Sequence, residues 1–333
     1  MSKIAAFLTV VVAAAVVALG ATPAGAAAPT KVWVSNAGVD SGTCGAVTAP
    51  CRSFFQASQN VAAGGDVGVL TPGDYGQPNI IKSMNITNDG VGEATIFASN
   101  GPNDSFFPGM IIVAGRGDVV SLRGLIVDGQ GGGGFGVGIN QVSAVHIQNC
   151  VIRNFEGPGN TGYGIAADPP TSTQLFVSDT LIYNNGTGPG TGGVVIAPQS
   201  SGSANVVLDR VHVENNVVGI SLDGSNSTGD GIHLVIRGSV VAGNASNGIV
   251  AFSQPGKPPA FILVEHSSSV NNAGTGILAD GPRAVILLKD NTITRNGTGI
   301  GAVNGGQLIS YGNNTNNNNI GPEGAPTSLF SPM

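Results

Sequence analysis

The sequence repeats with a period of 23 to 31 residues, and this periodicity limits the fold more than any other feature. A glycine followed by isoleucine or valine recurs once in each period. These pairs are Gly138-Ile139, Gly164-Ile165, Gly193-Val194, Gly219-Ile220, Gly248-Ile249, Gly276-Ile277 and Gly299-Ile300. A period of this length is typical of folds in which one small unit stacks on the next.

A second column of apolar residues runs through the same units and predicts short strands. Its members are Leu122, Ile147, Val177, Leu208, Ile236, Val264 and Leu288. Within each unit apolar residues alternate with period two and many are β-branched, which is typical of strands. Helical repeats need long amphipathic stretches and a propeller needs four strands per unit. We therefore predict an all-β fold, a parallel β-helix of roughly nine or ten coils with one coil per repeat.

A column of asparagines follows the strands at a predicted turn. It consists of Asn185, Asn216, Asn244, Asn272 and Asn296. Asparagine tolerates the left-handed backbone of tight turns, and stacked amides hydrogen-bond from one coil to the next. We therefore predict a structural role for these residues. The alternative is a row of amides that binds sugar.

The two ends of the solenoid carry different signals. The segment Pro50–Ala63 has the pattern of a short amphipathic helix suited to cap the first coil, whereas residues 313–319 are almost entirely asparagine. We expect an N-terminal segment with a capping helix over residues 27–64. The β-helix coils are expected over 65–312, and a polar C-terminal tail over 313–333.

Residues 1–26 have the features of an export signal. Lys3 precedes an apolar run from Ile4 to Leu19, and Ala24-Gly25-Ala26 is typical of a cleavage site. The run is short for a membrane span, although an uncleaved anchor is the alternative. No later stretch is apolar enough to cross a bilayer. We expect a secreted or periplasmic protein with no membrane span after cleavage.

The three cysteines agree with an oxidising compartment. Cys44 and Cys51 lie in a turn-rich segment in which they can form a disulfide, with free thiols or a metal site as alternatives. The metal site is disfavoured because no histidine or third cysteine lies nearby. Cys150 occupies a core position of the repeat and is expected to be a buried, unreactive thiol.

The charge balance excludes one class of partner. The chain has 13 Lys and Arg against 19 Asp and Glu, a pI near 5.0 and no basic run. Neutralising the phosphates of a nucleic acid needs clustered cations, so nucleic acid is not an expected partner.

Three segments resemble the opening of the pectin-lyase-like superfamily. They are Val32–Gly38, Gly65–Tyr75 and Ile81–Ile86. With the repeats, the similarity covers nearly all of the chain after residue 26, and more narrowly the chain looks like exported bacterial right-handed parallel β-helix repeat proteins. The resemblance implies right-handed coiling and an envelope or extracellular setting. It implies no activity, because one fold serves many functions.

Catalytic signatures of that superfamily are absent from the sequence. The polygalacturonase-type Gly-His-Gly and Arg-Ile-Lys segments, the pectate-lyase Arg-x-Pro-x-x-Arg pattern and the pectin-esterase Asp-Phe-Ile-Phe-Gly segment do not occur. Whether the protein is an enzyme is therefore left open. If it is one, a polysaccharide lyase is favoured.

One charged patch has two interpretations. Asp209, Arg237, Glu265 and Lys289 alternate in sign on successive predicted coils. A row of exposed ion pairs is the favoured interpretation, because opposite charges one coil apart attract. In the lyase interpretation, Arg210 or Arg237 neutralises a uronate carboxylate while His212, His266 or Lys289 removes the adjacent proton. The candidate catalytic residues are Asp209, Arg210, His212, Arg237, Glu265 and His266.

No cofactor or metal is predicted, and calcium has only weak support. The segment Asp223–Asp230 offers oxygen ligands for Ca²⁺. It lacks the spacing and the terminal glutamate of an EF-hand loop, so a polar turn is favoured.

Long loops follow the Gly-Ile strands and are expected to gather on one side of the solenoid. They are Ala166–Thr173, Ala197–Ala204, Leu222–Gly231 and Phe252–Ala260, and the loops Gly129–Gly138 and Phe155–Tyr163 are expected to form an opposite wall. Such insertions often mark a binding face. Tyr163, Tyr183, Phe176 and Phe252 are the aromatic candidates for stacking on sugar rings.

We therefore expect a protein that contacts extracellular or envelope polysaccharide without catalysis. The first alternative is a polysaccharide lyase or glycoside hydrolase with non-standard catalytic residues. The second is a structural or adhesive spacer that binds a protein partner.

Overall fold

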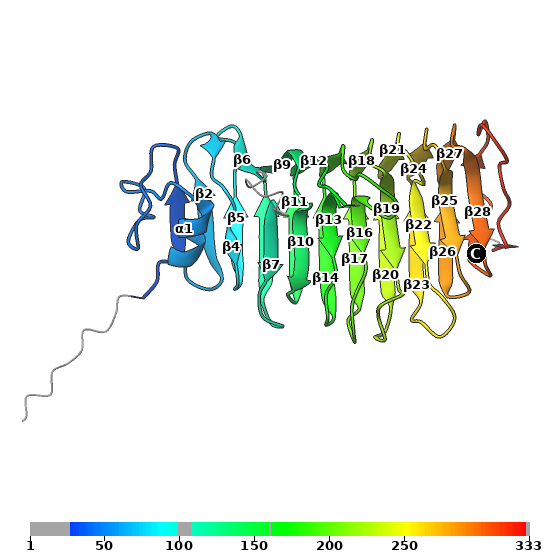
Figure 1. Cartoon of the computed structure of the whole chain (residues 1–333), viewed down its shortest axis with the longest axis horizontal. Helices are drawn as coiled ribbons and strands as arrows, with labels where there is room; N and C mark the ends of the chain where they lie inside the picture. Colours follow the sequence, from blue (N-terminus) through cyan, green and yellow to red (C-terminus); the bar gives the residue numbers. More distant parts are fainter. Residues whose placement is uncertain (1–26, 99–107, 160, 331–333) are drawn as a thin grey trace, which may run out of the picture.

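The chain is a parallel β-helix in which three long sheets run along the molecule (Figure 1). The computed structural model describes residues 27–98, 108–159 and 161–330, so the predicted export signal over 1–26 lies outside the described residues. Every strand pairing within the described sheets is parallel. This confirms the fold class predicted from the repeat.

The three sheets follow one another around each coil. The twelve-stranded sheet contains β1 (Lys31–Val34), β2 (Gly65–Val69), β5 (Met84–Thr87), β8 (Val119–Arg123), β11 (Ala144–Gln148), β14 (Thr173–Ser178), β17 (Ala204–Asp209), β20 (Ile232–Arg237), β23 (Ala260–Glu265), β26 (Ala284–Lys289), β29 (Gln307–Ser310) and β31 (Ser328–Leu329). The ten-stranded sheet contains β3 (Gly73–Asp74), β6 (Ala94–Phe97), β9 (Leu125–Gly132), β12 (Val151–Phe155), β15 (Leu181–Tyr183), β18 (His212–Glu214), β21 (Val240–Ala242), β24 (Ser268–Val270), β27 (Thr292–Thr294) and β30 (Thr315–Asn316). The nine-stranded sheet contains β4 (Asn79–Ile80), β7 (Met110–Val113), β10 (Phe135–Gln141), β13 (Tyr163–Ala167), β16 (Gly192–Ile196), β19 (Val218–Asp223), β22 (Ile249–Phe252), β25 (Thr275–Asp280) and β28 (Thr298–Val303).

The apolar columns of the sequence form the core. The column that begins at Leu122 is in register on consecutive strands of the twelve-stranded sheet, and all of its members are buried. The Gly-Ile column lies on the nine-stranded sheet, with one correction. The partner of Ile165 is Val137, two residues before the Ile139 that the sequence pattern indicates. The sequence pattern predicts the wrong register there because Gly136-Val137 and Gly138-Ile139 are adjacent and nearly identical dipeptides.

The asparagine column forms a buried, hydrogen-bonded ladder. Asn216 Nδ2 donates to Asn244 Oδ1 at 3.3 Å, and Asn244 Nδ2 donates to Asn272 Oδ1 at 2.8 Å. Each Oδ1 also accepts from the backbone N–H of the preceding asparagine, at 2.9 Å from Asn216 to Asn244. The same contacts link Asn185 at one end and Asn296 at the other. The ladder therefore satisfies buried backbone donors as well as its own amides.

The glycine column exists because the asparagine ladder packs against it. A Cβ atom on Gly248 would lie 2.7 Å from Asn272 Nδ2 and 2.5 Å from the carbonyl oxygen of Gly276. Real Cβ atoms do not approach so closely. The two columns thus form one contact that repeats on successive coils.

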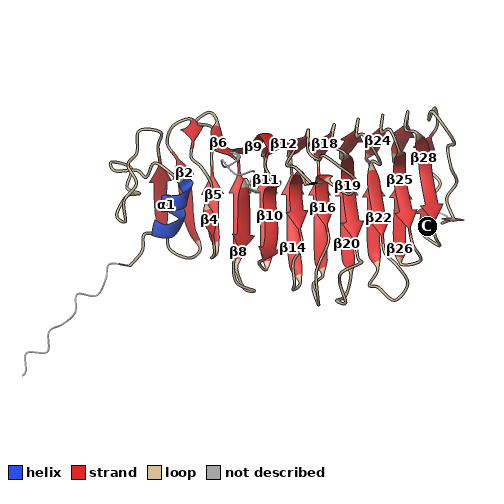
Figure 2. Cartoon of the chain, viewed as in Figure 1, coloured by secondary structure: helices blue, strands red, loops and turns tan. Residues whose placement is uncertain are grey.

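Both ends extend the stack beyond the limits expected from the sequence. At the N-terminus β1 pairs with β2, and the helix α1 (Phe54–Asn60), capped by Ser53, is shorter than the predicted 50–63 (Figure 2). At the C-terminus β30 and β31 pair onto the stack, and Asn319 Oδ1 accepts from Asn296 Nδ2 at 3.1 Å. The asparagine-rich tail continues the coil because amide hydrogen bonds replace apolar packing there.

The cysteines occupy two different environments. Cys44 and Cys51 form a disulfide, with their Cα atoms 5.0 Å apart. Cys150 is buried, and burial raises its pKa to about 11, so its thiol is protonated at neutral pH. Among the described residues, no helix has the length and apolar character to cross a membrane.

Replacing Asn244 with alanine is expected to destabilise the fold by about 2 to 4 kcal/mol, because it leaves the buried backbone N–H of Asn216 without its acceptor and removes one hydrogen bond from each of the side-chain amides of Asn216 and Asn272. The shift in the midpoint of urea denaturation, followed by circular dichroism, measures this loss. Asn226→Ala is the matched control, since Asn226 is exposed in the turn after β19. Equal shifts for the two variants would contradict a structural role for the ladder.

Candidate functional site

The six charged residues singled out by the sequence lie at one corner, between the twelve-stranded and the ten-stranded sheet. Asp209, Arg237 and Glu265 end strands β17, β20 and β23. Arg210 and His266 follow in turns with φ of 51° and 49°, and His212 begins β18. The corner therefore gathers these side chains in a row along the stack.

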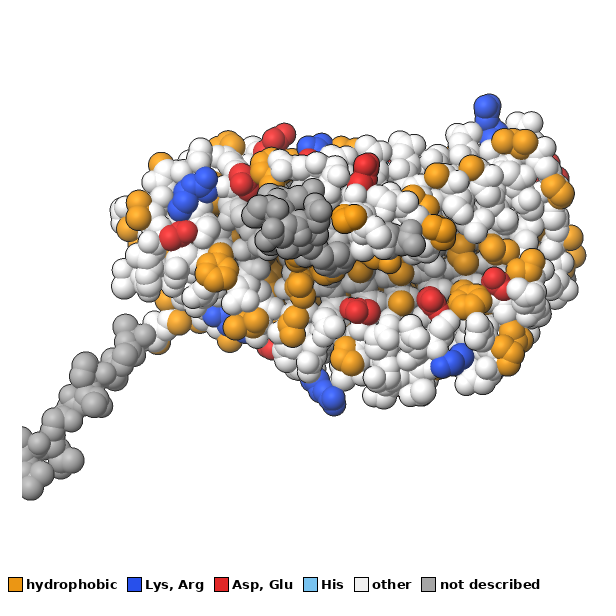
Figure 3. All heavy atoms as spheres, in the orientation of Figure 1, with side chains coloured by type: hydrophobic (Ala, Val, Ile, Leu, Met, Phe, Trp, Pro, Cys, Tyr) orange, Lys and Arg blue, Asp and Glu red, His pale blue; other side chains and the backbone are white. Residues whose placement is uncertain are grey.

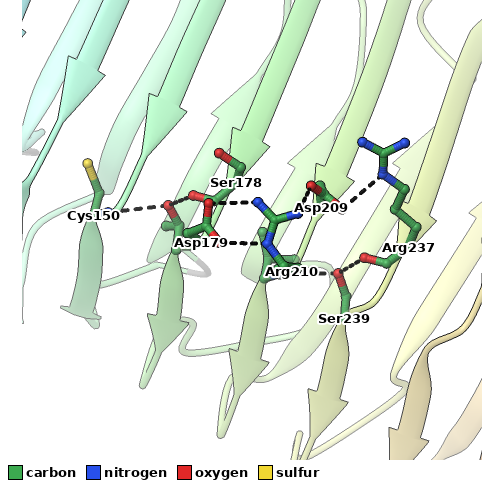
Figure 4. A network of polar contacts seen from close by, with 9 residues as sticks. Cys150, Ser178, Asp179, Asp209, Arg210, Arg237 and Ser239 are labelled. Carbon is green, nitrogen blue, oxygen red and sulfur yellow. Dashed lines mark hydrogen bonds and ion pairs between the residues drawn. The ribbon is translucent and has the colours of Figure 1, made fainter.

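Ion pairs already occupy both arginines of this corner (Figure 4). Arg210 donates from Nε and Nη2 to the two carboxylate oxygens of Asp179, at 2.7 and 2.9 Å, and it also pairs with Asp209. Arg237 Nε donates to Asp209 at 2.9 Å. The hydrogen bond from Arg210 lowers the pKa of Asp179. These guanidinium groups neutralise acids of the protein itself.

The predicted row of alternating charges is only partly formed. Glu265 pairs in register with Arg237 on one side and Lys289 on the other, yet no ion pair joins them in the described part of the chain. The two histidines have separate partners: His212 Nδ1 lies 2.8 Å from Glu214, and His266 Nε2 lies 3.5 Å from Asp290. Register brings these charges to neighbouring coils, but side-chain geometry decides which of them meet.

A groove lies on another face, the outer side of the nine-stranded sheet. It has a volume of about 590 Å³ over strands β7, β10, β13 and β16. Its lining is mainly apolar, with Ile111, Phe135, Tyr163 and Val195 among its residues, and Asp168 is one of the few polar groups. Small residues such as Gly138 and Ala166 line its floor and leave space between the larger side chains. Figure 3 shows this face, with hydrophobic side chains along a hollow between the two walls of loops.

The floor of the groove continues beyond this cavity along the sheet. The outward position of Ala166 is in register with Val195, and the row goes on through Ser221, Val250 and Leu278. Phe252 lies on the same face, two residues after Val250 in β22. Stacked coils thus turn one outward position per repeat into a continuous strip.

Loops border the groove on both sides. The insertions that follow β13, β16, β19 and β22 all connect the nine-stranded to the twelve-stranded sheet, so they gather along one edge, low in the view of Figure 1. The opposite edge differs from expectation. Residues 129–138 are mainly strand, because β9 runs to Gly132 and β10 starts at Phe135. The second predicted loop, Phe155–Tyr163, does connect two strands, since β12 ends at Phe155 and β13 begins at Tyr163.

A buried carboxylate organises that opposite edge. The side chain of Asp128 is 8% exposed and accepts hydrogen bonds from Gln130 N at 2.8 Å, Asn154 Nδ2 at 3.0 Å and Arg153 Nε at 2.8 Å. Burial raises the pKa of Asp128, but these donors outweigh burial and leave the pKa lowered. Gln130 and Asn154 have φ of 53° and 60°. Asp128 therefore holds the left-handed backbone positions of Gln130 near the end of β9 and of Asn154 near the end of β12.

The predicted aromatic residues divide between faces. Tyr163 lines the groove and Phe252 lies on the same sheet, but the other two lie elsewhere. Phe176 stacks on His146 across the twelve-stranded sheet, with ring centroids 4.8 Å apart, and Tyr183 accepts a hydrogen bond from Arg153 at 2.9 Å. Phe135 is a groove residue that the sequence analysis missed, because it falls in the segment assigned to a loop.

The polar segment considered for calcium is hydrogen-bonded within the protein. Asp223 Oδ1 accepts from Ser225 N at 2.8 Å, and the Ser227 hydroxyl donates to Gly202 O at 2.6 Å. One cluster of three potential metal ligands occurs among the described residues, Asp40 with Cys44 and Cys51. Its two sulfur atoms are joined in the disulfide.

Three solved structures are similar to this chain. Pectate lyase Pel9A matches with a TM-score of 0.61 and 14% identity, over 91% of this chain and 80% of that chain. The mannuronan C-5 epimerase AlgE4 A-module of Azotobacter vinelandii has a TM-score of 0.47 and 14% identity, over 81% of this chain and 91% of that chain. The periplasmic alginate epimerase AlgG has a TM-score of 0.46 and 16% identity, over 81% of this chain and 74% of that chain.

No family model and no curated protein matches the sequence. The chain shares its parallel β-helix fold with pectate lyase Pel9A, in agreement with the fold that the resemblance in the sequence implied. At this level of identity the likeness concerns the fold, and function has to be argued from the site.

The lowered pKa of Asp128 makes the stability of this edge depend on pH. A lowered folded pKa adds stability above the unfolded value of 3.8, and this stability is lost as the pH falls through the folded value. We expect Asp128→Asn to cost about 1.5 to 3 kcal/mol at pH 7 and progressively less below about pH 4. Denaturation midpoints measured across this range test it. Asp74→Asn, at an exposed site, is the control variant.

Arg210→Ala separates the two interpretations of the charged corner. If the corner is a set of exposed ion pairs, the variant loses a little stability at low salt and none at high salt, because salt screens exposed charges. Its interaction with polysaccharide should stay unchanged. Denaturation at two salt concentrations and the polymer assays below measure both quantities. Loss of polymer turnover with an unaltered denaturation midpoint would support catalysis at this corner.

Proposed function

We propose that this protein is exported and contacts polysaccharide along the groove of the nine-stranded sheet without catalysing a reaction. The observation that supports this most strongly is the groove itself, an apolar strip that runs along the stack and is bordered by loops on both edges. Apolar and aromatic side chains with a few polar groups are the usual lining of ligand sites. Sugar rings present apolar C–H faces that pack against such a floor.

The dimensions of the strip favour a polymer over a small ligand. Nine strands spaced about 4.8 Å apart give a sheet face roughly 38 Å long. The groove is open to solvent and continues from coil to coil, so one chain molecule can contact several coils at once. Weak contacts that repeat along a polymer add up to useful binding.

The contacts of the charged corner argue against the lyase alternative. Arg210 and Arg237 are the residues required to neutralise a uronate carboxylate, and both are paired with acids of the protein. Releasing them would cost those ion pairs. An adhesive spacer that binds a protein remains the other alternative, and the experiment below separates it from the proposal.

A panel of polysaccharides tests the proposal. Purified protein is incubated with soluble uronate polymers while the ultraviolet absorbance of unsaturated products is followed, and with immobilised neutral, anionic and cationic polymers in a retention assay. We expect retention by at least one polymer and no rise in absorbance. A rise would show lyase activity, and the absence of any retention would favour the spacer.

A matched pair of variants locates the contact. Tyr163→Ala removes an aromatic ring from the groove and should weaken retention about fivefold, equivalent to roughly 1 kcal/mol. Phe176→Ala removes a ring from the outer face of the twelve-stranded sheet and should leave retention unchanged. The reverse pattern would place the contact on the other sheet.

A further inference from the structure

Three aspartates on the groove face have no cationic partner. Asp168 lines the groove, and Asp223 and Asp280 end strands β19 and β25 of the same sheet. Asp223 accepts a hydrogen bond from Ser225 N, and Asp280 accepts one from Asn304 Nδ2 at 2.8 Å. Within the described residues none of the three forms an ion pair. We refer to them as the aspartate row.

Several carboxylates on the other two sheets do have a basic partner. Asp128, Asp179 and Asp209 each pair with an arginine, and Asp290 lies beside His266. Lys257 and Arg283 follow β22 and β25 in loops, where the Arg283 side chain donates to the backbone oxygen of Lys257. Glu265 on the twelve-stranded sheet is also unpaired, but on the groove face the unpaired carboxylates of the described residues stand in one line.

The aspartate row has a regular spacing that the register imposes. Ala167, Ile196 and Leu222 are partners on consecutive strands, so the residues that follow them also stand side by side. Those residues are Asp168, Ala197 and Asp223. Asp223 pairs with Phe252 and Phe252 with Asp280. The carboxylates thus occupy every second coil, roughly 9.6 Å apart, since neighbouring strands lie about 4.8 Å apart.

This row selects the charge of a polymer in the groove. A polyuronate carries a carboxylate on each sugar and would place like charges against the aspartate row, where the apolar walls weaken solvent screening. Those walls also raise the pKa of Asp168 by displacing water around its carboxyl, although the side chain remains accessible. A second anion nearby would add to that cost, whereas a cation would relieve it.

The spacing selects the geometry of the polymer. In an extended β-1,4-linked chain, successive sugars are turned by about half a rotation, so equivalent groups recur on one side at every second sugar. The length of two such sugars is close to the distance between two members of the aspartate row. An amino group on every second sugar can then meet each carboxylate while the ring faces lie on the apolar floor.

We infer that the groove takes a cationic, β-1,4-linked amino-sugar polymer of the glucosamine type. Its rings pack on the strip from Ala166 to Leu278, and its ammonium groups pair with Asp168, Asp223 and Asp280. This inference rests on the proposed polysaccharide function and specifies the substrate class of the same groove.

Calorimetric titration with three hexasaccharides tests the inference. The probes are β-1,4-linked glucosamine hexamer, its fully N-acetylated neutral counterpart and a galacturonate hexamer, in a mildly acidic buffer that contains a chelator and keeps the amines protonated. We expect the glucosamine hexamer to bind tightest. Its affinity should fall as salt is raised, because exposed ion pairs are screened.

A pair of triple variants assigns the effect to the aspartate row. Asp168→Asn, Asp223→Asn and Asp280→Asn together should weaken binding of the glucosamine hexamer about tenfold, roughly twofold for each exposed ion pair. The control changes net charge equally at sites away from the groove: Asp66→Asn, Asp74→Asn and Glu93→Gln. It should bind like the unchanged protein. Circular dichroism of both variants verifies that they fold.

The outcomes distinguish failure of the inference from failure of the proposed function. Tighter binding of the galacturonate or the neutral hexamer would overturn the amino-sugar inference and leave polysaccharide binding intact. Equal losses in the two triple variants would show that net charge, not the aspartate row, is responsible. If no hexamer binds and no polymer is retained, both proposals fail.

Discussion

The contact between the asparagine ladder and the glycine column governs the rest of this structure. Each buried asparagine accepts the backbone N–H of its neighbour and donates to the next amide, for example from Asn244 to Asn272. The amides fit only because glycines such as Gly248 leave no Cβ in their way. Such a contact is satisfied only when consecutive coils are in register, since a buried amide without a partner is costly. The ladder therefore fixes the register of each coil on the next.

Fixed register explains why surface chemistry appears in rows. Once Ile220 is aligned with Val194, the outward positions around them are aligned as well, and one residue type per repeat becomes a strip along the molecule. The apolar floor of the groove and the aspartate row both arise in this way. The solenoid presents the same kind of contact at intervals of one or two coils, which suits a partner that is itself a repeating chain.

The candidate site shows where sequence reasoning is weaker than it is for the fold. The charges at Asp209 and Arg237 were expected to meet, and they do, but the row does not continue to Glu265 and Lys289. Register predicts which residues are neighbours, whereas rotamers and competing partners decide which of them pair. Arg210, for instance, reaches back to Asp179 on the preceding coil. The slip between Val137 and Ile139 has a related cause, because two near-identical dipeptides cannot be told apart without their partners in space.

The sequence by itself determined the period and the inward apolar columns, and hence a parallel β-helix. These features depend on local alternation and on a repeat that can be recognised without knowing which residues are in contact. It also indicated the asparagine column, because one asparagine recurs at the corresponding position of each repeat. Asp168, Asp223 and Asp280 each stand three residues after the isoleucine of a Gly-Ile pair, so their column is also present in the sequence. Only the tertiary structure decided that this column lies on the outward face of the sheet that carries the groove, and that none of its aspartates forms an ion pair among the described residues, because both depend on contacts between coils.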